Sequence, residues 1–277
     1  MTRYYKVSGS GNDFLALVEP DRDPGEAEIA AWCRRGLSLG ADGLFTLRRR
    51  NSGVKMDYWN ADGHSAPLCI NGTRCAARLA MELGWAGSAV EVLTGAGPVA
   101  ARAASGERIS LEFPPPKEAP APRRVEALGE TWEGYFQVVG VPHFVILWPH
   151  GMASVPVATL GAALRHHPAF APEGTNVNFV RFPAAGRLEI RSFERGVEAE
   201  TLACGSGVLA ASAVGVHLGC AALPLEVLTA GGFVIAVSGE ADGNRIRRWE
   251  MAGDARILAE GTLRAEAAEL PPAAHWS

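Results

Sequence analysis

CINGTRCAARLAMELGWAGSAVEVLTGAGPVAA, residues 69–101, and CGSGVLAASAVGVHLGCAALPLEVLTAGGFVIA, residues 204–236, are two versions of one pattern. Aligned without a gap at an offset of 135 residues, they agree at 13 of 33 positions. The shared positions include the leading cysteine, a Leu-Gly pair and the four-residue run Glu-Val-Leu-Thr. Similarity at a fixed spacing is the signature of a repeated structural unit. The sequence therefore predicts a duplicated domain with one cysteine, Cys69 or Cys204, in each copy.

The repeat also indicates the fold class. In both copies an apolar, alanine-rich segment follows the cysteine, which predicts helices at 71–83 and 205–218, the first with Gly84 as its C-terminal cap. Shorter helices are predicted at 26–39 and near 159–166, and many short strand patterns surround them. This pattern predicts an α+β protein with two pseudo-symmetric domains. Each domain is expected to be a mostly antiparallel sheet or barrel wrapped around a central helix.

The expected domain boundary lies in a proline-rich run. Residues 114–122 read PPPKEAPAP, a composition typical of a stiff, extended linker. We therefore expect an N-terminal half over 1–116 and a C-terminal half over 117–261.

Composition favours a small-molecule partner. The formal net charge of −4 gives no basic footprint for nucleic acid or an anionic membrane. The longest weakly polar run, 208–225, is broken by polar residues and a proline, which favours a buried helix over a membrane span. No signal peptide is visible, and five cysteines without disulfide or zinc spacing fit a reducing cytoplasm. We expect a cytoplasmic protein without a metal, a nucleic acid partner or a membrane.

The position of each repeated cysteine predicts its chemistry. Cys69 precedes Ile70-Asn71-Gly72 and Cys204 precedes Gly205-Ser206-Gly207, each at the start of a predicted helix. The first N–H groups of a helix lack intrahelical partners, and the helix dipole is positive there. Both effects stabilise a thiolate and also an anion such as a carboxylate. One such cysteine is typical of a nucleophile, whereas two at matching ends of duplicated halves indicate acid–base chemistry.

A pair of thiols suits a reaction that inverts a stereocentre. If the two helix ends face each other, one thiolate can remove a proton from a planar centre while the opposite thiol delivers one. Amides at the helix ends would hold the substrate carboxylate and its developing charge. This predicts racemisation or epimerisation of an α-amino acid. None of the three lysines, Lys6, Lys55 and Lys117, lies near the repeated motif, so neither pyridoxal phosphate nor any other cofactor is expected.

Six short motifs carry a family resemblance. They are GNDF at 11–14, NADG at 60–63, CINGTRC at 69–75, GVPH at 140–143, PEGTNVN at 172–178, and ERG at 194–196 followed by CGSG at 204–207. In these motifs and their order the chain resembles the diaminopimelate epimerase family. The resemblance implies a cofactor-independent isomerase that interconverts LL- and meso-2,6-diaminopimelate, on the route to lysine and peptidoglycan. It further implies an active site in the cleft between the domains, a homodimer, and a last strand over 262–277 that returns to the first domain.

The resemblance also assigns roles to single residues. Cys69 and Cys204 match the catalytic acid–base pair, and His143 and Glu194 match groups that tune the thiol pKa. Substrate-binding positions are matched by Asn12, Asn60, Ile70, Asn71, Asn176, Glu194, Arg195, Gly205 and Ser206.

The chain departs from the family pattern at three positions. Ile70 stands where many members have glycine, Val141 where many have asparagine, and Ala259 where a tyrosine contributes to the dimer contact. The first two keep open a racemase of the same fold acting on another amino acid, such as histidine. A non-catalytic amino-acid-binding protein is a further alternative, although binding alone needs no thiol on each face.

The site candidates also have structural interpretations. The asparagines lie in turns, where this residue type often serves the backbone, and Glu194 and Arg195 alone would suit a surface ion pair. His143 lies in an apolar strand, as a core histidine would. The other cysteines, Cys33, Cys75 and Cys220, are expected to be buried and inert.

Overall fold

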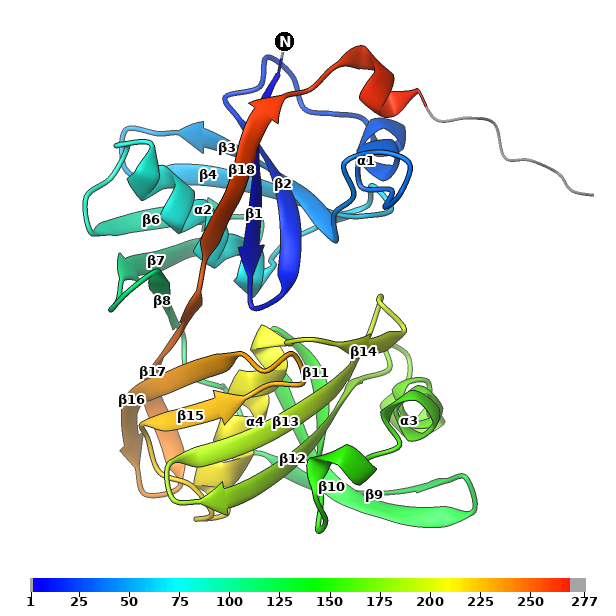
Figure 1. Ribbon diagram of the computed structural model, residues 1–277. Helices are drawn as coiled ribbons and strands as arrows, with labels where there is room; N and C mark the ends of the chain where they lie inside the picture. Colours follow the sequence, from blue (N-terminus) through cyan, green and yellow to red (C-terminus); the bar gives the residue numbers. More distant parts are fainter. Residues whose placement is uncertain (1, 270–277) are drawn as a thin grey trace, which may run out of the picture. The chain divides into compact units, whose positions relative to one another are not determined.

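Two buried helices of 13 residues, α2 (Ile70–Glu82) and α4 (Gly205–His217), organise a chain that otherwise consists mainly of strands (Figure 1). The computed structural model describes residues 2–269. These separate into two compact units: unit 1, with residues 2–111 and 254–269, and unit 2, with residues 112–253. The boundaries fall inside two strands, and each unit is described below by itself.

Unit 1 contains the helices α1 (Glu26–Trp32) and α2 and the 3₁₀ helix η4 (Ala265–Ala268). Its strands are β1 (Arg3–Gly9), β2 (Asn12–Val18), β3 (Gly43–Arg49), β4 (Val54–Asn60), β5 (Ser65–Ala66), β6 (Ala89–Thr94), β7 (Gly97–Ala103), most of β8 (Arg108–Phe113) and β18 (Arg256–Thr262).

Unit 2 contains the helices α3 (Ala162–Arg165) and α4 and the short helices η1 (Met152–Ser154), η2 (Val157–Gly161) and η3 (Pro168–Phe170). Its strands are β9 (Ala121–Ala127), β10 (Glu130–Val139), β11 (Val141–Leu147), β12 (Asn176–Ala184), β13 (Arg187–Glu194), β14 (Ala199–Thr201), β15 (Leu225–Leu228), β16 (Val234–Asp242) and most of β17 (Arg245–Asp254).

The strand pairings of the two units follow the same plan. In unit 1, β18, β1 and β2 are antiparallel neighbours, β2 runs parallel to β3, and β3 is antiparallel to β4. β4 then pairs antiparallel with β5 and parallel with β6, which is antiparallel to β7. In unit 2 the strands β9 to β16 repeat each of these pairings in the same order. The predicted pseudo-symmetric α+β fold is therefore confirmed.

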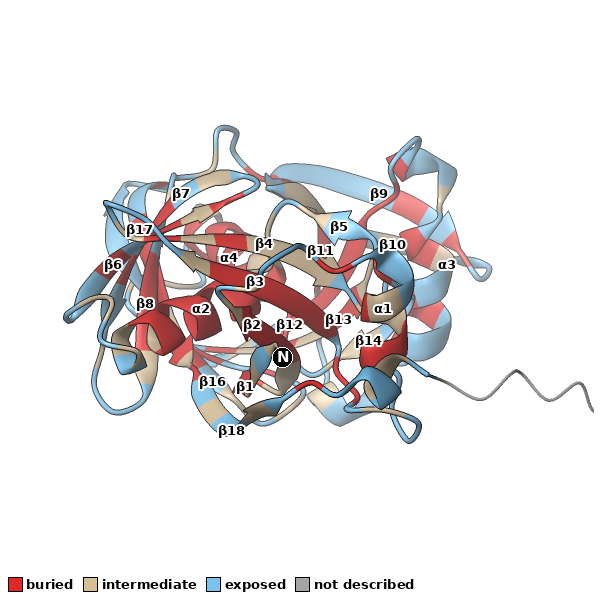
Figure 2. Ribbon diagram, turned by 90° about the horizontal axis from the view of Figure 1, so that it is seen from above, coloured by how far each residue is buried: buried red, intermediate tan, exposed pale blue. Residues whose placement is uncertain are grey.

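Each unit wraps its strands around its 13-residue helix. α2 contacts β1, β2, β4, β6, β7 and β18, and α4 contacts β10, β11, β12, β13 and β16. α4 is apolar on every side, as a helix enclosed by strands must be, and both helices appear largely buried in Figure 2. Both also end at a glycine with positive φ, Gly84 and Gly219. The predicted helices 71–83 and 205–218 are confirmed to within one residue at each end.

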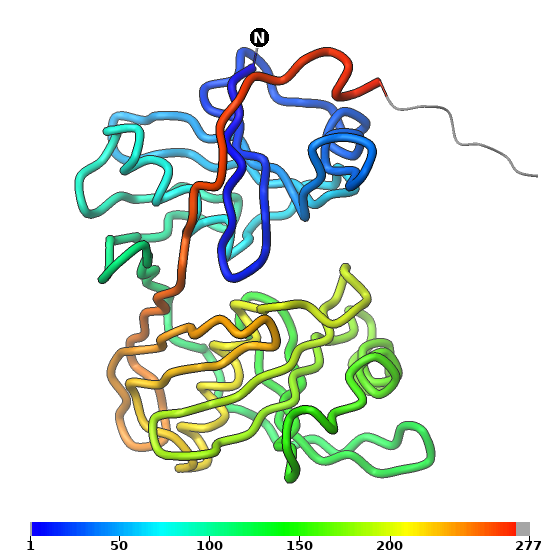
Figure 3. The backbone as a smooth tube through the Cα atoms, viewed as in Figure 1, coloured from blue at the N-terminus to red at the C-terminus, as the bar shows by residue number. Residues whose placement is uncertain are grey.

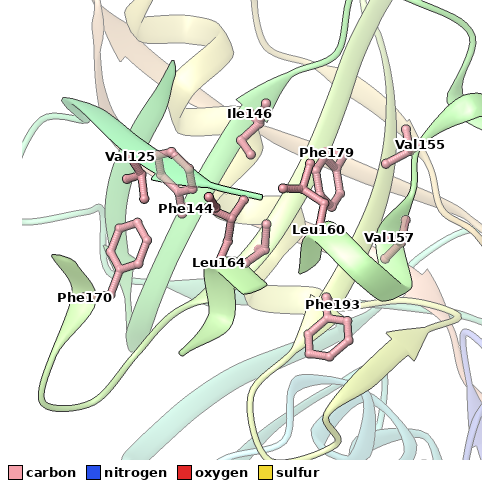
Figure 4. Packing of buried hydrophobic residues seen from close by; sticks show 12 residues of the cluster. Val125, Phe144, Ile146, Val155, Val157, Leu160, Leu164, Phe170, Phe179 and Phe193 are labelled. Atoms are coloured by element: carbon pink, nitrogen blue, oxygen red, sulfur yellow. The ribbon is translucent and has the colours of Figure 1, made fainter. Parts of the chain in front are cut away.

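Aromatic side chains fill the part of unit 2 around α3. Phe144, Phe170, Phe179 and Phe193 pack with aliphatic residues from η2, α3 and the neighbouring strands (Figure 4). Phe144 and Phe179 are completely buried. This cluster lies under α3 and anchors the strands β11, β12 and β13, whose ends carry several of the predicted site residues.

The chain returns to unit 1 through β18. This strand pairs with β1 in an antiparallel ladder, so the first and last strands of the fold lie side by side (Figure 3). The returning strand was expected over 262–277, but it covers 256–262 and gives way to η4. Residues 270–277 lie outside the described part of the chain. The assignment of functional halves to 1–116 and 117–261 stays a prediction.

Three predicted elements differ in length. α1 ends at Trp32 instead of residue 39, because the amides of Gly40 and Ala41 loop back to the carbonyls of Trp32 and Cys33. The second short helix begins earlier than expected, as the π-helical turn η2 followed by α3. The proline-rich run 114–122 is not wholly a linker, since its last two residues begin β9 and pair with β10.

Cys220 was expected to be buried but is exposed.

The phenylalanine cluster gives a stability prediction. Replacing Phe144 by alanine removes a fully buried ring, and we expect this to lower the free energy of unfolding by about 3–5 kcal/mol. Urea denaturation measures the change. Val138→Ala, at a side chain of the same unit that is 46% exposed, is the control and should cost less than about 1 kcal/mol. Equal losses in the two variants would contradict the packing described here.

Candidate active site

The predicted site residues gather at one end of each unit. In unit 1, Asn12 is the first residue of β2, Asn60 is the last of β4, and Cys69 directly precedes α2. Because β2 and β3 are parallel and β4 is antiparallel to them, the start of β2 and the end of β4 lie at the same edge. In unit 2 the start of β12 at Asn176 and the end of β13 at Glu194 lie at the equivalent edge, and Cys204 directly precedes α4.

Cys69 caps helix α2 with its sulfur. Its backbone is extended, with φ −130° and ψ 110°, and its Sγ accepts a hydrogen bond from the Gly72 amide at 3.5 Å. A cysteine side chain thus takes the place of the Ser, Thr, Asp or Asn that usually caps a helix. The amide hydrogen bond and the positive end of the helix both favour negative charge on this sulfur. Ile70 and Asn71 supply the next backbone amides of the same turn.

Polar side chains surround Cys69. Its thiol lies 3.8 Å from the Asn12 Oδ1 atom, which accepts its hydrogen. Burial, together with the nearby sulfur, raises the pKa of Tyr58, so the phenol stays protonated. Tyr58 Oη also donates to Asn60 Oδ1 at 3.0 Å. Tyr58 therefore orients the Asn60 amide.

The Asn12 amide is held in place by an acidic neighbour. Its Nδ2 donates to Asp42 Oδ2 at 2.9 Å, which leaves Oδ1 toward Cys69. The other oxygen of Asp42 accepts from Arg35 at 2.8 Å. The orientation of Asn12 is thus fixed by side chains outside the predicted site.

Arg74 is a buried cation behind the first turn of α2. It is completely buried and donates through Nη2 to Asn71 Oδ1 and to Ser10 Oγ, both at 2.8 Å. Its Nε donates to the Asp254 carbonyl at 3.2 Å, and the Asp254 carboxylate accepts from the Ser10 hydroxyl at 3.0 Å. A buried guanidinium is costly unless it is well hydrogen-bonded, so this network ties the turn before β2 to the start of α2.

Cys204 has a different electrostatic environment. It is 4% exposed, and its sulfur lies 3.6 Å from the Ser206 hydroxyl. Burial raises the pKa of the Cys204 thiol well above its usual value, and the neighbouring Glu194 carboxyl raises it further. Gly205 and Ser206 form the first turn of α4, as expected. The structure thus favours the protonated form of Cys204.

Glu194 is itself perturbed by its surroundings. Burial raises the pKa of its carboxyl, while a hydrogen bond from the Thr201 hydroxyl acts in the opposite direction. Asn60 in unit 1 ends the strand that corresponds to the one ended by Glu194. A neutral amide in one unit therefore corresponds to a carboxyl in the other, and this asymmetry distinguishes the surroundings of the two cysteines.

Asn176 and Arg195 are joined by the backbone. The Arg195 amide donates to Asn176 Oδ1 at 2.8 Å, and Asn176 Nδ2 donates to the Pro142 carbonyl at 3.1 Å. The Arg195 guanidinium reaches the Glu173 carboxylate at 3.4 Å, and its side chain is 29% exposed. Asn176 therefore positions the backbone of Arg195 and leaves the guanidinium at the surface of unit 2.

His143 is completely buried in β11. Burial lowers the pKa of its imidazole to about 3, with the positive charge of Arg195 as a smaller cause. The ring is therefore neutral at physiological pH. Its Nδ1 atom lies 3.1 Å from Asn178 Nδ2.

Several contributors escaped the sequence analysis. Tyr58 and Asp42 lie outside every motif quoted above, and Arg74 lies inside one without a role assigned to it. Arg74 could have been found from the sequence, because it is a charged residue at a position that the helix pattern places in the core. Nothing in the local sequence of Tyr58 or Asp42 indicates their contacts, because both depend on strand register.

Two further observations on residues 2–269 concern metal binding and membrane insertion. This part of the chain contains no group of three or more His, Cys, Asp or Glu side chains arranged to hold a metal ion. It also contains no helix both long and apolar enough to span a bilayer.

Comparisons with known proteins give a consistent result. The sequence model of the diaminopimelate epimerase family matches residues 4–110 and 135–258. A diaminopimelate epimerase from Aquifex aeolicus is 34% identical over 96% of this chain and 99% of its own length. One from Methanothrix thermoacetophila is 38% identical over 83% of this chain and 86% of its own.

Solved structures extend the likeness to the fold alone. A phenazine biosynthesis protein of the PhzF family from Enterococcus faecalis superposes with a TM-score of 0.70 at 16% identity, covering 94% of this chain and 98% of the other. A hydroxyproline epimerase from Agrobacterium vitis gives 0.64 at 16% identity, covering 94% and 91%.

The first turns of α2 and α4 give a matched pair of substitutions. A Cβ on Gly207 would lie 2.4 Å from Asn178 Oδ1, whereas one on the corresponding Gly72 would meet the mobile end of Met56 at 2.9 Å. We expect Gly207→Ala to lower the free energy of unfolding by about 1–3 kcal/mol, because a buried, hydrogen-bonded amide must move. Gly72→Ala should cost clearly less. Urea denaturation of both variants tests the order, and the reverse order would contradict this packing.

The Glu194 carboxyl gives a prediction about pH. Glu194→Gln removes a negative charge that disfavours the Cys204 thiolate, so the pKa of Cys204 should fall. The pH dependence of Cys204 alkylation, followed by mass spectrometry, should shift to lower pH in this variant. Glu200→Gln is the control, because Glu200 is paired with Arg191 at 2.6 Å and should leave the profile unchanged. An unshifted profile in Glu194→Gln would show that the carboxyl does not act on the sulfur.

Proposed function

The chain belongs to the diaminopimelate epimerase family, and we propose that it is an isomerase that interconverts LL- and meso-2,6-diaminopimelate by inverting one α-carbon. The observation that carries the proposal is the placement of the two cysteines. Each of two equivalent folds has a cysteine directly before its buried helix, at the edge where polar side chains gather.

The proposed reaction is a proton exchange between two sulfurs and one carbon. One thiolate takes the α-proton from one face of the substrate, and the electron pair of the broken C–H bond passes into the α-carboxylate. The other thiol gives its proton to the opposite face, which inverts the centre and leaves a thiolate there. The roles of Cys69 and Cys204 exchange in the reverse direction. This chemistry needs no cofactor.

The charge that develops on the carboxylate needs donors placed in advance. Backbone amides of Ile70, Asn71, Gly205 and Ser206 belong to the first turns of α2 and α4, at the positive ends of the two helix dipoles. We propose that they bind the carboxylate of the reacting centre. Such donors stabilise the transition state more than the ground state, because the negative charge on the oxygens grows as the proton leaves.

The remaining polar residues would bind the ends of the zwitterionic substrate. We propose that Glu194 and Arg195 bind an ammonium and a carboxylate group, and that Asn12, Asn60 and Asn176 orient the substrate by hydrogen bonds. These types suit a molecule that carries both charges at each end. Glu194 would have a second role, keeping Cys204 protonated at rest so that it can act first as the acid.

A racemase for another amino acid is the second candidate. Val141 begins β11 as Asn12 begins β2, so unit 2 has an apolar side chain where unit 1 has an amide. Val141 therefore offers no side-chain hydrogen bond to a polar group at the far end of the substrate. A substrate with a different side chain, such as histidine, would miss that donor less than diaminopimelate would.

Cellular setting and assembly are also proposals. We propose a cytoplasmic enzyme, supported by five free cysteines that include exposed Cys220. A homodimer is supported by the family resemblance alone. At the position on β18 where the resemblance implies a tyrosine in the dimer contact, this chain has Ala259.

Hydrogen exchange tests the proposed reaction. In deuterium oxide, the wild-type protein should convert LL-diaminopimelate to the meso form with deuterium at the inverted carbon, as followed by NMR and chiral chromatography. Cys69→Ala and Cys204→Ala should each lower the rate of inversion by at least about 10²–10⁴-fold, because each removes one of the two proton-transfer groups. Cys220→Ala, at an exposed cysteine of unit 2, should retain wild-type activity.

The same assay distinguishes the alternatives. Exchange with L-histidine and none with diaminopimelate would favour the second candidate. Exchange with no amino acid would leave a binding protein, and full activity in either cysteine variant would exclude the two-thiol scheme.

A further inference from the structure

The two units place different chemistry at equivalent buried positions. Phe14 is the first residue of β2 that pairs with the parallel strand β3, and His143 is the first residue of β11 that pairs with the parallel strand β12. Phe14 and His143 therefore occupy equivalent positions. Phe45 is the third residue of β3 and Asn178 is the third residue of β12, so these two residues correspond. Phe45 pairs with Tyr58 on β4 and Asn178 pairs with Ser192 on β13, so Tyr58 and Ser192 also correspond. Three aromatic residues in unit 1 are thus matched by three polar residues in unit 2.

The contacts within each set differ accordingly. In unit 1 the ring of Phe14 packs on Phe45 and Tyr58, with centroids 6.1 and 6.0 Å apart. In unit 2 the Ser192 hydroxyl donates to Asn178 Oδ1 at 2.8 Å, and Asn178 Nδ2 lies 3.1 Å from His143 Nδ1. His143 and Asn178 are fully buried and Ser192 is 4% exposed.

Burying this polar set is costly, so its retention requires a benefit. Each buried polar group costs free energy unless it is hydrogen-bonded, and the rings of Phe14 and Phe45 show that the same fold accepts apolar residues at two of these three positions. The chain of hydrogen bonds satisfies the serine, the amide and one ring nitrogen. Within residues 2–269, His143 Nε2 is buried and has no hydrogen-bond partner.

The direction of the hydrogen bonds determines where the imidazole proton lies. Because the Ser192 hydroxyl donates to Oδ1, the amide of Asn178 presents its N–H to His143. A ring nitrogen that accepts from an amide has no hydrogen of its own, so in the neutral ring the proton is on the other nitrogen. We propose that Asn178 and Ser192 are positioning residues that hold His143 as the tautomer protonated on Nε2, with this N–H kept as a donor for an anionic group of the reaction.

The network also contacts the turn that follows Cys204. Asn178 Oδ1 lies so close to Gly207 that a Cβ there would be 2.4 Å from it, and the same Cβ would be 3.2 Å from the Cys204 sulfur. Asn178 thus lies between the imidazole and the first turn of α4. The ring orientation and the position of that turn are fixed by one amide, so a change in Asn178 affects both.

The tautomer can be observed in the ligand-free protein. With ¹⁵N-labelled histidine, long-range ¹H–¹⁵N correlation spectra distinguish the two neutral tautomers, and His143→Gln identifies the His143 signals among those of the seven histidines. We expect the Nε2-protonated form in the wild type. Asn178→Asp offers Nδ1 only an acceptor, so a proton should move to Nδ1. Ser192→Ala frees the amide to turn and should give a mixture of tautomers.

Matched controls separate positioning from general damage to the core. Ser212→Ala removes another buried hydroxyl, one that donates to the Val208 carbonyl within α4, and should leave the His143 spectrum and kcat unchanged. Asn178→Asp should lower kcat about 10–100-fold, as is typical when the partner that orients a functional histidine is lost. Ser192→Ala provides the test if Asn178→Asp does not fold.

The outcomes are distinct for the tautomer and for the reaction. A wild-type His143 protonated on Nδ1, or a tautomer unchanged in both Asn178→Asp and Ser192→Ala, would overturn the proposal. The effect on kcat rests on the proposed function, whereas the spectra need no substrate. Absence of epimerase activity with the expected spectra would therefore refute the function and leave the tautomer assignment intact.

Discussion

The structure depends on a helix end that must be buried and still satisfied. α2 and α4 are enclosed by strands, so their first amides cannot rely on bulk water for hydrogen bonds. A cysteine before each helix places a polarisable sulfur beside these amides, and at Cys69 the sulfur accepts from Gly72. Small residues in the following turn leave space there. At α2 the hydrogen bond that satisfies the helix end thus also polarises the thiol of Cys69.

Duplication of this arrangement is followed by divergence of its electrostatics. Unit 1 places the buried cation Arg74 behind the cysteine-capped turn, whereas the corresponding position of unit 2, Leu209, is apolar. Unit 2 places Glu194 next to its thiol and raises the pKa of Cys204. Two identical thiols would share no defined division between acid and base. In the proposed reaction, the different neighbours of Cys69 and Cys204 would supply that division on one scaffold.

The shared strand register lets the two units carry different side chains at equivalent positions. Pairings are the same in both units, so equivalent rungs can be compared residue by residue. The set Phe14, Phe45 and Tyr58 keeps unit 1 packed by aromatic contacts, while its counterpart in unit 2 is a hydrogen-bonded chain. Interiors tolerate such exchange only when every polar atom finds a partner. Among the side chains of His143, Asn178 and Ser192, the Nε2 atom of His143 is the buried polar atom that has no partner.

The sequence by itself determined the duplication, the two long helices and the positions of Cys69 and Cys204 directly before them, because these depend on local patterns: small residues after a cysteine, an apolar helix period and a repeated spacing. It failed where distant segments meet. The end of α1 at Trp32 depends on a returning loop, and β9 begins inside a run that looks like a linker. The contacts of Tyr58 and Asp42 and the chain from Ser192 through Asn178 to His143 depend on register between strands, which no local pattern encodes. Tertiary structure decided them, because hydrogen-bond partners are selected by proximity in space and not along the chain.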